Sequence, residues 1–190
     1  MTKFKADMPD LSNSLVAAKG LLGWKLVHDS PEGLTSGYIV ETEAYDMSDP
    51  ASHAFGGERI RNRSMFMPAG TVYVYFTYGI HYCVNVVTGG RGEGQGVLIR
   101  ALEPYEGVDI MRLRRKTDNP LNLCSGPAKL VQAMGISKDD DGTVLGQGLI
   151  NLEPGFTPTD VVRTTRIGIT KAIDQPWRFY IADNPHVSKR

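Results

Sequence analysis

The sequence predicts a single α+β domain built around a mostly antiparallel β-sheet. The chain is rich in strand-like segments, several of them are joined by turns short enough for hairpins, and helix-like segments are interspersed among them. Its 190 residues suffice for one domain with a well-buried core, and 41% hydrophobic with 22% charged residues is an ordinary globular balance. We therefore expect residues 1–190 to form one domain.

The N-terminal part predicts a short helix followed by two strands. Apolar residues at helical spacing indicate a helix within 15–22, which Ser12 or Ser14 can cap. Strands are predicted at 24–28 and 35–45, because each is apolar and β-branched and a D-S-P-E-G turn separates them. These two strands are expected to begin the sheet.

The middle of the chain predicts a loop, a tight hairpin and a further strand. Residues 46–64 are polar and irregular, as is typical of an ordered loop. Residues 71–78 and 80–88 are strongly strand-like, and Gly79 between them indicates a tight turn. A glycine-rich connection then leads to a strand predicted at 97–102.

The C-terminal part predicts two helices and two strands. A helix is expected at 108–115, and a second one opens at the Gly-Pro pair 126–127 and ends at Gly135. Residues 138–158 are expected to be a connection. The final strands are predicted around 166–170 and 177–182, and the sequence does not predict whether the segment after 182 is ordered.

Composition excludes several classes of protein. The formal net charge is zero, so a polyanion would have to be held by a local patch. Two cysteines, Cys83 and Cys124, in a chain whose first ten residues lack a secretion signal favour a reduced, cytoplasmic protein. A run of about 20 apolar residues is absent, so a membrane span is not expected. The sequence patterns of zinc and nucleotide sites are absent too, and no cofactor is predicted.

The predicted strand at 35–45 ends in two carboxylates and a tyrosine on one face. Period-two alternation places Ile39, Glu41, Glu43 and Tyr45 on the same side. Burying a carboxylate is costly without a partner, so these glutamates are either solvated on an open strand face or kept for chemistry such as general-base catalysis. A metal site formed by Glu41, Glu43 and His53 is a further alternative.

The predicted hairpin carries aromatic residues up to its tip. Alternation places Tyr73 and Tyr75 on one face and Val74, Phe76 and Tyr78 on the other, with Tyr78 at the turn. Cross-strand packing explains Tyr73 and Phe76. An aromatic residue at the tip is expected to be exposed, which favours insertion into a target such as a base stack.

Basic residues gather in three segments of the chain. Together with the helix start at 126–127, they could follow a phosphate backbone, although an ordinary solvated surface explains them equally well. The segments contain Arg59, Arg61 and Arg63; Arg112, Arg114, Arg115 and Lys116; and Arg163, Arg166 and Lys171.

Six short motifs occur in an order that resembles one known family. From about residue 21 to 180, the chain is similar to the alkyladenine DNA glycosylases, also called 3-methyladenine or methylpurine DNA glycosylases. The motifs are E-T-E-A-Y (41–45), A-S-H-A (51–54), R-N-R-S-M-F (61–66), Y-V-Y-F-T-Y-G (73–79), V-L-I-R-A-L-E-P (97–104) and C-S-G-P-A-K-L (124–130).

The resemblance implies a curved sheet with flanking helices and a protruding β-hairpin that enters the DNA minor groove. It also implies a monomeric enzyme that flips alkylated purines, and possibly deaminated ones, out of double-stranded DNA and initiates base excision repair without metal or cofactor. The motif that carries Glu43 has no lysine, so a Schiff-base lyase step is not expected. A lesion-binding protein without catalysis and the metal-dependent hydrolase remain alternatives.

Carried over to this sequence, the resemblance implies a catalytic set of three residues. Glu43 matches the general base, and Arg100 matches the arginine that helps to hold the attacking water. A main-chain carbonyl in the R-I-G-I stretch at 166–169 completes the water site, and Ile167 is its expected donor. Glu41 has no role in this scheme.

The resemblance also implies a base pocket and a wedge. Asn85 matches a residue that excludes the exocyclic amino group of guanine, and Tyr78 matches the wedge that fills the gap in the duplex, with Ile80 beside it where methionine is common. The loop at 56–63 lacks the usual T-P-R. The residues that match the walls of the base pocket are Tyr45, His53 and Tyr75.

Overall fold

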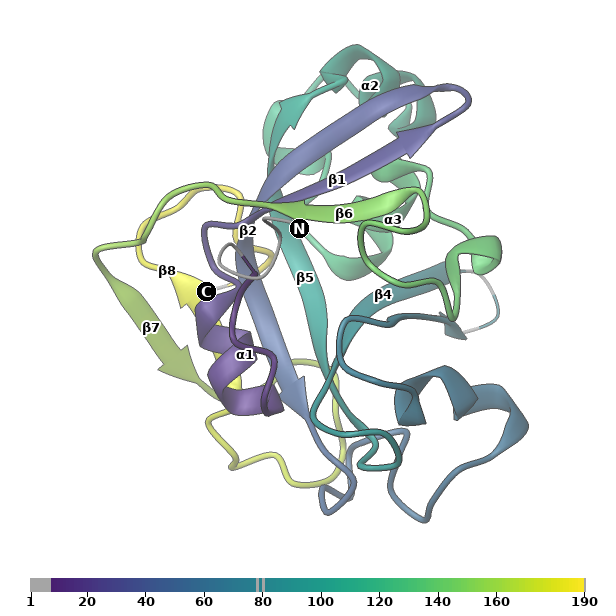
Figure 1. The fold of residues 1–190 in the computed structure, drawn as a ribbon. Coiled ribbons are helices and arrows are strands. Elements are labelled where there is room, and N and C mark those ends of the chain that lie inside the picture. The colour runs from purple at the N-terminus through teal and green to yellow at the C-terminus, as the bar shows by residue number, and fades with distance from the viewer. Residues whose placement is uncertain (1–7, 78, 80, 190) are drawn as a thin grey trace.

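The protein folds around one curved antiparallel sheet, which confirms the α+β class (Figure 1). The computed structural model describes residues 8–77, 79 and 81–189. Its strands are β1 (Lys25–Ser30), β2 (Gly33–Tyr45), β3 (Val72–Thr77), β4 (His81–Thr88), β5 (Gln95–Glu106), β6 (Ile150–Glu153), β7 (Val161–Thr164) and β8 (Arg178–Ile181).

Helices are short in this fold. The α-helices are α1 (Ser14–Gly20), α2 (Val108–Arg115) and α3 (Pro127–Met134), and the 3₁₀ helices are η2 (Ile60–Phe66), η3 (Pro120–Asn122) and η4 (Lys138–Asp140). α2 and α3 have the predicted bounds. The N-cap of α1 is Asn13, whose side chain accepts from the N–H of Val16 at 2.9 Å, and not one of the serines on either side of it. None of the described helices is long and apolar enough to cross a bilayer.

β2 is the central strand of the sheet. The strand order is β3-β4-β5-β2-β1-β6, with β8 also paired to β2 and β7 paired to β8. One edge of β2 pairs with β5, while the other pairs with β1 over residues 33–38 and with β8 over 41–43. Register shifts against β5 occur between Ile39 and Thr42. The acidic motif therefore begins where β2 changes its partner strand.

The core lies between the sheet and the helices α1 and α3. Leu21 after α1, Ile99 and Leu102 on β5, and Leu130 and Met134 on α3 have no exposed surface. The hydroxyl of Thr42 donates to the carbonyl of Ala18 at 2.6 Å, so this residue of β2 faces α1. Its neighbours Glu41 and Glu43 consequently face the other side of the strand.

Three predicted segments differ from the structure. Residues 166–170 form a bend and not a strand, and the nearby strand β7 lies earlier in the chain. Gly168 within that bend has φ +76°, a conformation that does not belong to a strand. The predicted connection 138–158 contains β6, and the predicted loop 46–64 contains most of η2.

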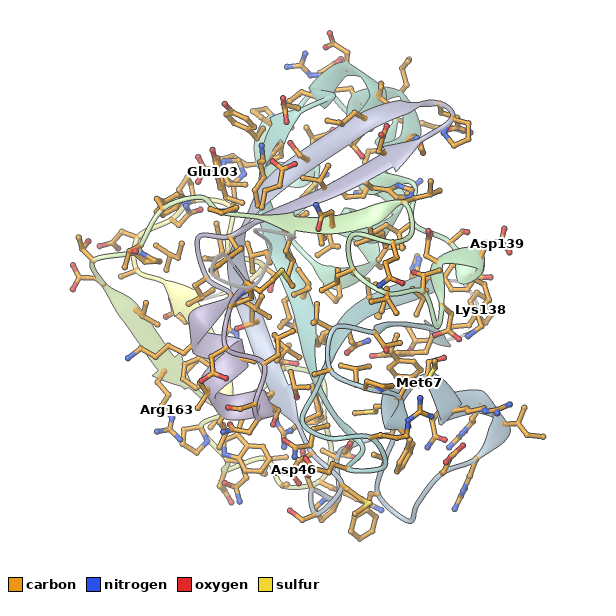
Figure 2. All side chains as sticks on the ribbon, in the orientation of Figure 1. Asp46, Met67, Glu103, Lys138, Asp139 and Arg163 are labelled. Carbon is orange, nitrogen blue, oxygen red and sulfur yellow. The ribbon has the colours of Figure 1, made fainter. Side chains whose placement is uncertain are left out.

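Charged side chains point outward from several parts of the molecule. Figure 2 shows this for Lys138 and Asp139 on η4 and for Arg163 on β7. The formal net charge of zero therefore includes exposed charges of both signs. A site for an anionic partner has to come from local geometry and not from the charge of the whole protein.

Candidate active site

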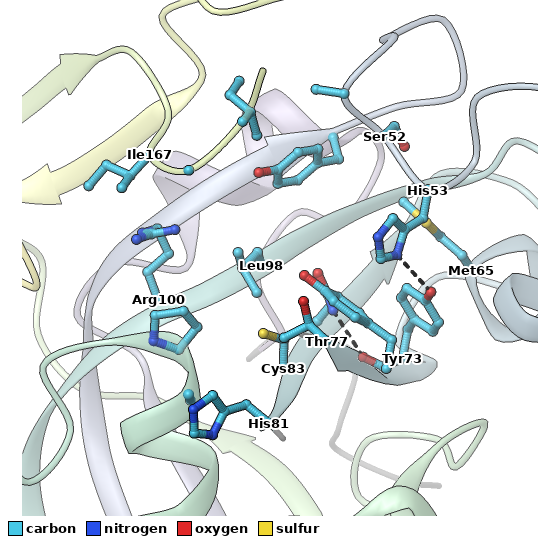
Figure 3. Close-up of a pocket in the computed structure, with 18 of the residues that line it drawn as sticks. Ser52, His53, Met65, Tyr73, Thr77, His81, Cys83, Leu98, Arg100 and Ile167 are labelled. Carbon is cyan, nitrogen blue, oxygen red and sulfur yellow. Dashed lines mark hydrogen bonds between the residues drawn. The ribbon is translucent and has the colours of Figure 1, made fainter. Parts of the chain in front are cut away.

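A cavity of about 610 Å³ opens beside the acidic end of β2 (Figure 3). Its floor comes from β3, β4 and β5, and its rim comes from the loop at 50–53, the start of α3 and the bend at 167–171. The lining includes six residues singled out from the sequence: Tyr45, His53, Tyr75, Asn85, Arg100 and Ile167.

One wall of the cavity consists of aromatic rings. Tyr73 and Tyr75 on β3 both line it, as alternation predicts, with ring centroids 5.4 Å apart. The imidazole of His53 meets the Tyr75 ring edge-on at 4.4 Å, and its Nδ1 lies 3.1 Å from the Tyr73 hydroxyl (Figure 3). Burial raises the pKa of both tyrosines well above the ordinary value, so their hydroxyls stay neutral. This wall suits a planar, apolar ligand face.

Asn85 holds a fixed position on the floor of the cavity. It lies opposite Tyr73 in the β3–β4 register, and its side-chain amide donates to the Tyr73 carbonyl at 3.1 Å. Only 5% of the residue is exposed. A ligand that reaches the floor therefore meets a side chain that cannot easily move aside.

Glu43 lies behind the cavity wall and is held by three donors. Oε2 accepts from the Tyr45 hydroxyl at 2.8 Å and from Nη1 of Arg100 at 3.2 Å. Oε1 accepts from the main-chain N–H of Ile167 at 2.8 Å. All three donor residues line the cavity, whereas Glu43 itself has no exposed surface. The described residues thus occupy three of about four acceptor sites on this carboxylate.

Glu41 is buried as well, and its environment corrects the expectation of a solvated carboxylate. It has no exposed surface and accepts from Nε of Arg100 at 3.1 Å and Nε of Arg178 at 2.7 Å. The N–H and hydroxyl of Ser188 also donate to it, at 2.7 and 2.9 Å. Two glutamates and two arginines therefore form one buried cluster, the Glu41–Glu43–Arg100–Arg178 cluster, in which the formal charges cancel.

Arg100 links the two carboxylates of this cluster. Burial opposes its charge, but Glu43 and Glu41 outweigh that cost and raise the pKa of Arg100 above its ordinary value. The guanidinium therefore stays charged and neutralises one carboxylate. In Figure 3 its side chain reaches from β5 toward the bend that carries Ile167.

The bend at 166–169 is fixed by a fully buried arginine. Arg166 forms an ion pair with Asp49 and donates to the Ala44 carbonyl at 3.0 Å. Its guanidinium lies 4.5 Å from the centre of the Tyr45 ring and 5.1 Å from that of Trp177. Arg166 thereby holds both Ile167 and Tyr45, two of the three groups that donate to Glu43.

The comparison with known proteins identifies the family. A family model for methylpurine-DNA glycosylase (MPG) matches residues 10–185. The chain belongs to this family. Methylpurine-DNA glycosylases hydrolyse N-glycosyl bonds, so the protein is an enzyme of that class. The match includes every site residue named above except Ser188.

Similar proteins cover nearly the whole chain. A protein of Methanoculleus marisnigri is 52% identical over 183 residues, covering 94% of this chain and 95% of its own. A protein of Francisella tularensis subsp. tularensis is 49% identical over 185 residues, covering 92% and 93%. One of Carboxydothermus hydrogenoformans is 49% identical over 179 residues, covering 93% and 94%. All three bear the name "Putative 3-methyladenine DNA glycosylase".

The alternative metal site of Glu41, Glu43 and His53 is not assembled in this glycosylase. Arg100, Arg178 and Ser188 donate to Glu41, and His53 packs against the tyrosines of the opposite wall. Among the residues that the structure describes, no group of three or more histidine, cysteine, aspartate or glutamate residues could hold a metal ion.

The structure describes the basic segments but not the two predicted wedge residues. Tyr78 and Ile80 lie outside the described residues, so their predicted roles stay predictions. In the segment at 112–116, Arg114 binds Glu32 and the Ala133 carbonyl, and Arg115 binds the Leu123 carbonyl. These two arginines therefore connect α2 to neighbouring segments of the protein. Arg59, Arg61 and Arg63 are exposed, and Asn62 between them donates to the carbonyl of His53, so this basic segment lies next to the loop that carries His53.

Sequence reasoning missed part of the cavity. Thr77 lies two residues after Tyr75 on β3, and Leu98 lies two residues before Arg100 on β5, so each shares a strand face with a predicted site residue. Alternation alone is therefore enough to place both in the cavity. No periodic pattern indicates the residues contributed by loops and helix starts. The lining residues that sequence reasoning did not name as pocket residues include Ser52, Met65, Thr77, His81, Cys83, Leu98 and Pro127.

Proposed function

We propose that this glycosylase removes alkylated purines from double-stranded DNA, with Glu43 as the general base. The observation that carries the proposal is the position of Glu43: three donors orient its carboxylate directly behind a cavity walled by aromatic rings. A positioned carboxylate contributes about 10²–10⁴-fold by general-base catalysis. The family and the names of its relatives agree with N-glycosyl hydrolysis at 3-methyladenine.

The cavity receives the base after it leaves the duplex. Extruding a nucleotide costs a few kcal/mol, and Tyr78, with Ile80 beside it, offsets this by filling the vacated stack from the minor-groove side. Tyr45 and Tyr75 then face the base. N-alkylation makes many purines cationic, and cation–π attraction to a tyrosine ring contributes roughly 0.5–2 kcal/mol. Deaminated purines fit the same walls through stacking alone.

Water attacks the sugar as the base leaves. The transition state resembles an oxocarbenium ion, so Glu43 both accepts the proton of the water and offsets the positive charge. Arg100 and the main-chain carbonyl of Ile167 orient that water. Because Glu43 has no exposed surface, the groups that cover it have to shift before the water reaches it, and we place this movement at entry of the base. No metal or cofactor takes part in this scheme.

Asn85 determines which bases the floor of the cavity admits. Its amide is fixed by the Tyr73 carbonyl, so the exocyclic amino group of an unmodified guanine would clash with it. Exclusion of this kind costs the correct base nothing. It adds to a second source of selectivity, because the glycosidic bond of an unmodified purine is harder to break than that of an alkylated purine. The enzyme acts as a monomer and starts base excision repair by leaving an abasic site.

A base-release assay tests this function directly. Methylated and deaminated duplex DNA is incubated with the protein, and the released bases are identified by chromatography, with and without a chelator. We expect release of 3-methyladenine that the chelator does not change. Loss of release with the chelator would indicate the metal-dependent hydrolase. Tight lesion binding without any released base would indicate the non-catalytic binding protein.

The protonation of His53 predicts a pH effect on lesion binding. Burial and the neighbouring Arg61 lower the pKa of His53 below its ordinary value of 6.5, so the imidazole is neutral at pH 7 and gains charge only as the pH falls through that lowered value. A charged His53 beside Tyr75 would repel a cationic base. We expect binding of DNA with a cationic lesion to weaken toward low pH and binding of a hypoxanthine lesion to change less.

Fluorescence titration of both duplexes measures this effect. The control is His53→Gln, which keeps hydrogen-bonding capacity without a titrating charge and should make the two pH profiles parallel. Tighter binding of the cationic lesion at low pH would show instead that His53 contacts a DNA phosphate.

A further inference from the structure

Glu41 has no role in the proposed reaction, although it is among the most highly constrained side chains in the protein. It accepts four hydrogen bonds: from Nε of Arg100, from Nε of Arg178, and from the N–H and hydroxyl of Ser188, all within 3.1 Å. Three of these bonds end on Oε1 and one on Oε2. Glu41 has no exposed surface and does not line the cavity, so its function has to be sought in the groups that it holds.

Glu41 holds one edge of Arg100. It binds Nε, while Nη1 of the same guanidinium reaches Glu43 at 3.2 Å. The guanidinium is planar and its five N–H groups form a rigid fork, so fixing Nε determines where the other hydrogens point. Arg100 also lines the cavity. Glu41 therefore sets the direction in which Arg100 faces both Glu43 and a substrate.

The C-terminal segment 184–189 supplies the remaining hydrogen bonds to Glu41. Ser188 supplies two of the four hydrogen bonds, and the Lys189 carbonyl accepts from Nη2 of Arg178. The side chain of Asn184 ties the beginning of the same segment to Glu103 on β5, at 2.8 Å. In Figure 1 the C-terminal end lies next to β8, the strand that carries Arg178. The family match ends at residue 185, before Ser188.

Stability alone is a poor reason for such a cluster. Taking an ion out of water is costly, and apolar residues of similar size often replace buried ion pairs without loss of stability. Hydrogen bonds to the charged groups offset part of that cost. What the charges add is direction, because hydrogen bonds fix an orientation that apolar contacts leave free.

We propose that Glu41 and Ser188 are positioning residues for the reaction. The C-terminal segment fixes Glu41, Glu41 fixes Arg100, and Arg100 holds Glu43 and the attacking water in the geometry for base release. This inference rests on the proposed roles of Glu43 and Arg100. It makes the C-terminal segment part of the catalytic machinery although that segment does not line the cavity.

The matched variants Ser188→Ala and Ser36→Ala test the inference. Each removes a serine hydroxyl that donates to a glutamate, but Ser188 donates to Glu41, whereas Ser36 on β2 donates to Glu106 at 2.7 Å and neither of these two residues lines the cavity. Misplacing a reacting group by about 1 Å can cost up to 10²-fold. We expect Ser188→Ala to lower the single-turnover rate of base release about tenfold with lesion binding unchanged. Ser36→Ala should keep the wild-type rate, and Ser188→Thr, which retains the hydroxyl, should recover most of that rate.

Glu41→Gln tests the next step of the same chain of contacts. Glutamine keeps one acceptor oxygen but lacks the charge that pairs with the guanidinium groups of Arg100 and Arg178, so Arg100 loses its fixed direction. We expect Glu41→Gln to lower the single-turnover rate at least as much as Ser188→Ala does, with lesion binding unchanged.

Two results would overturn the inference, provided that the wild-type protein releases base. One is a Ser188→Ala rate equal to that of Ser36→Ala. The other is a Glu41→Gln variant that releases base at the wild-type rate. The second result is decisive even if Ser188→Ala proves too unstable to assay. Absence of base release by the wild-type protein, or full release by a Glu43 variant, would instead reject the proposed function.

Discussion

Replacing Glu43 with glutamine is expected to lower the rate of base release by about 10²–10⁴-fold. Glutamine cannot take a proton from water, and it offers no negative charge to the developing oxocarbenium ion. It retains one oxygen for the Tyr45 hydroxyl and for Arg100, which share Oε2 of the native carboxylate. Binding of lesion-containing DNA should therefore survive. Single-turnover release and equilibrium binding to the same methylated duplex measure the two properties separately.

Glu106→Gln is a suitable control for this substitution. It makes the same chemical change on β5, at a residue that does not line the cavity, and should leave both properties unaltered. Thermal unfolding of the two variants separates loss of catalysis from loss of fold. Base release by Glu43→Gln at close to the wild-type rate would remove Glu43 from the mechanism, and the proposed function would need another base.

Local patterns predicted much of the site. Period-two alternation is enough to place Glu41 and Glu43 on one face of β2 and Tyr73 and Tyr75 on one face of β3, because a strand's geometry repeats every two residues. The glycine at 135 likewise marks the end of α3, where it adopts φ +74°. These features depend only on residues close together in the sequence.

The burial of Glu41 depends on residues far away in the sequence. Arg178 and Ser188 lie 137 and 147 positions further along the chain, so no window around Glu41 contains its partners. The bend at 166–170 was predicted as a strand for a related reason. Its alternating apolar residues suit a strand, but the buried ion pair of Arg166 with Asp49 and the positive φ of Gly168 impose another shape. The roles of Arg100 and Ile167 came from family resemblance and not from pattern.

Replacing Arg166 with methionine is expected to destabilise the protein by about 3–5 kcal/mol, the usual cost of leaving one partner of a buried ion pair alone. The Arg166 side chain is completely buried, and Asp49 is nearly so. Chemical denaturation measures the change. Arg163→Met, three residues earlier on β7, removes an exposed arginine that stacks on Phe179 at 5.7 Å, and should cost less than about 1 kcal/mol.

The double variant Asp49→Asn/Arg166→Met separates charge from packing. It removes the orphaned carboxylate charge, so it should be more stable than Arg166→Met alone. Base release should nevertheless stay low, because the guanidinium no longer supports the Tyr45 ring and the bend that carries Ile167. Recovery of stability together with full recovery of base release would show that Arg166 only neutralises Asp49. Recovery of stability without activity would show that a buried arginine holds two of the three groups that orient Glu43.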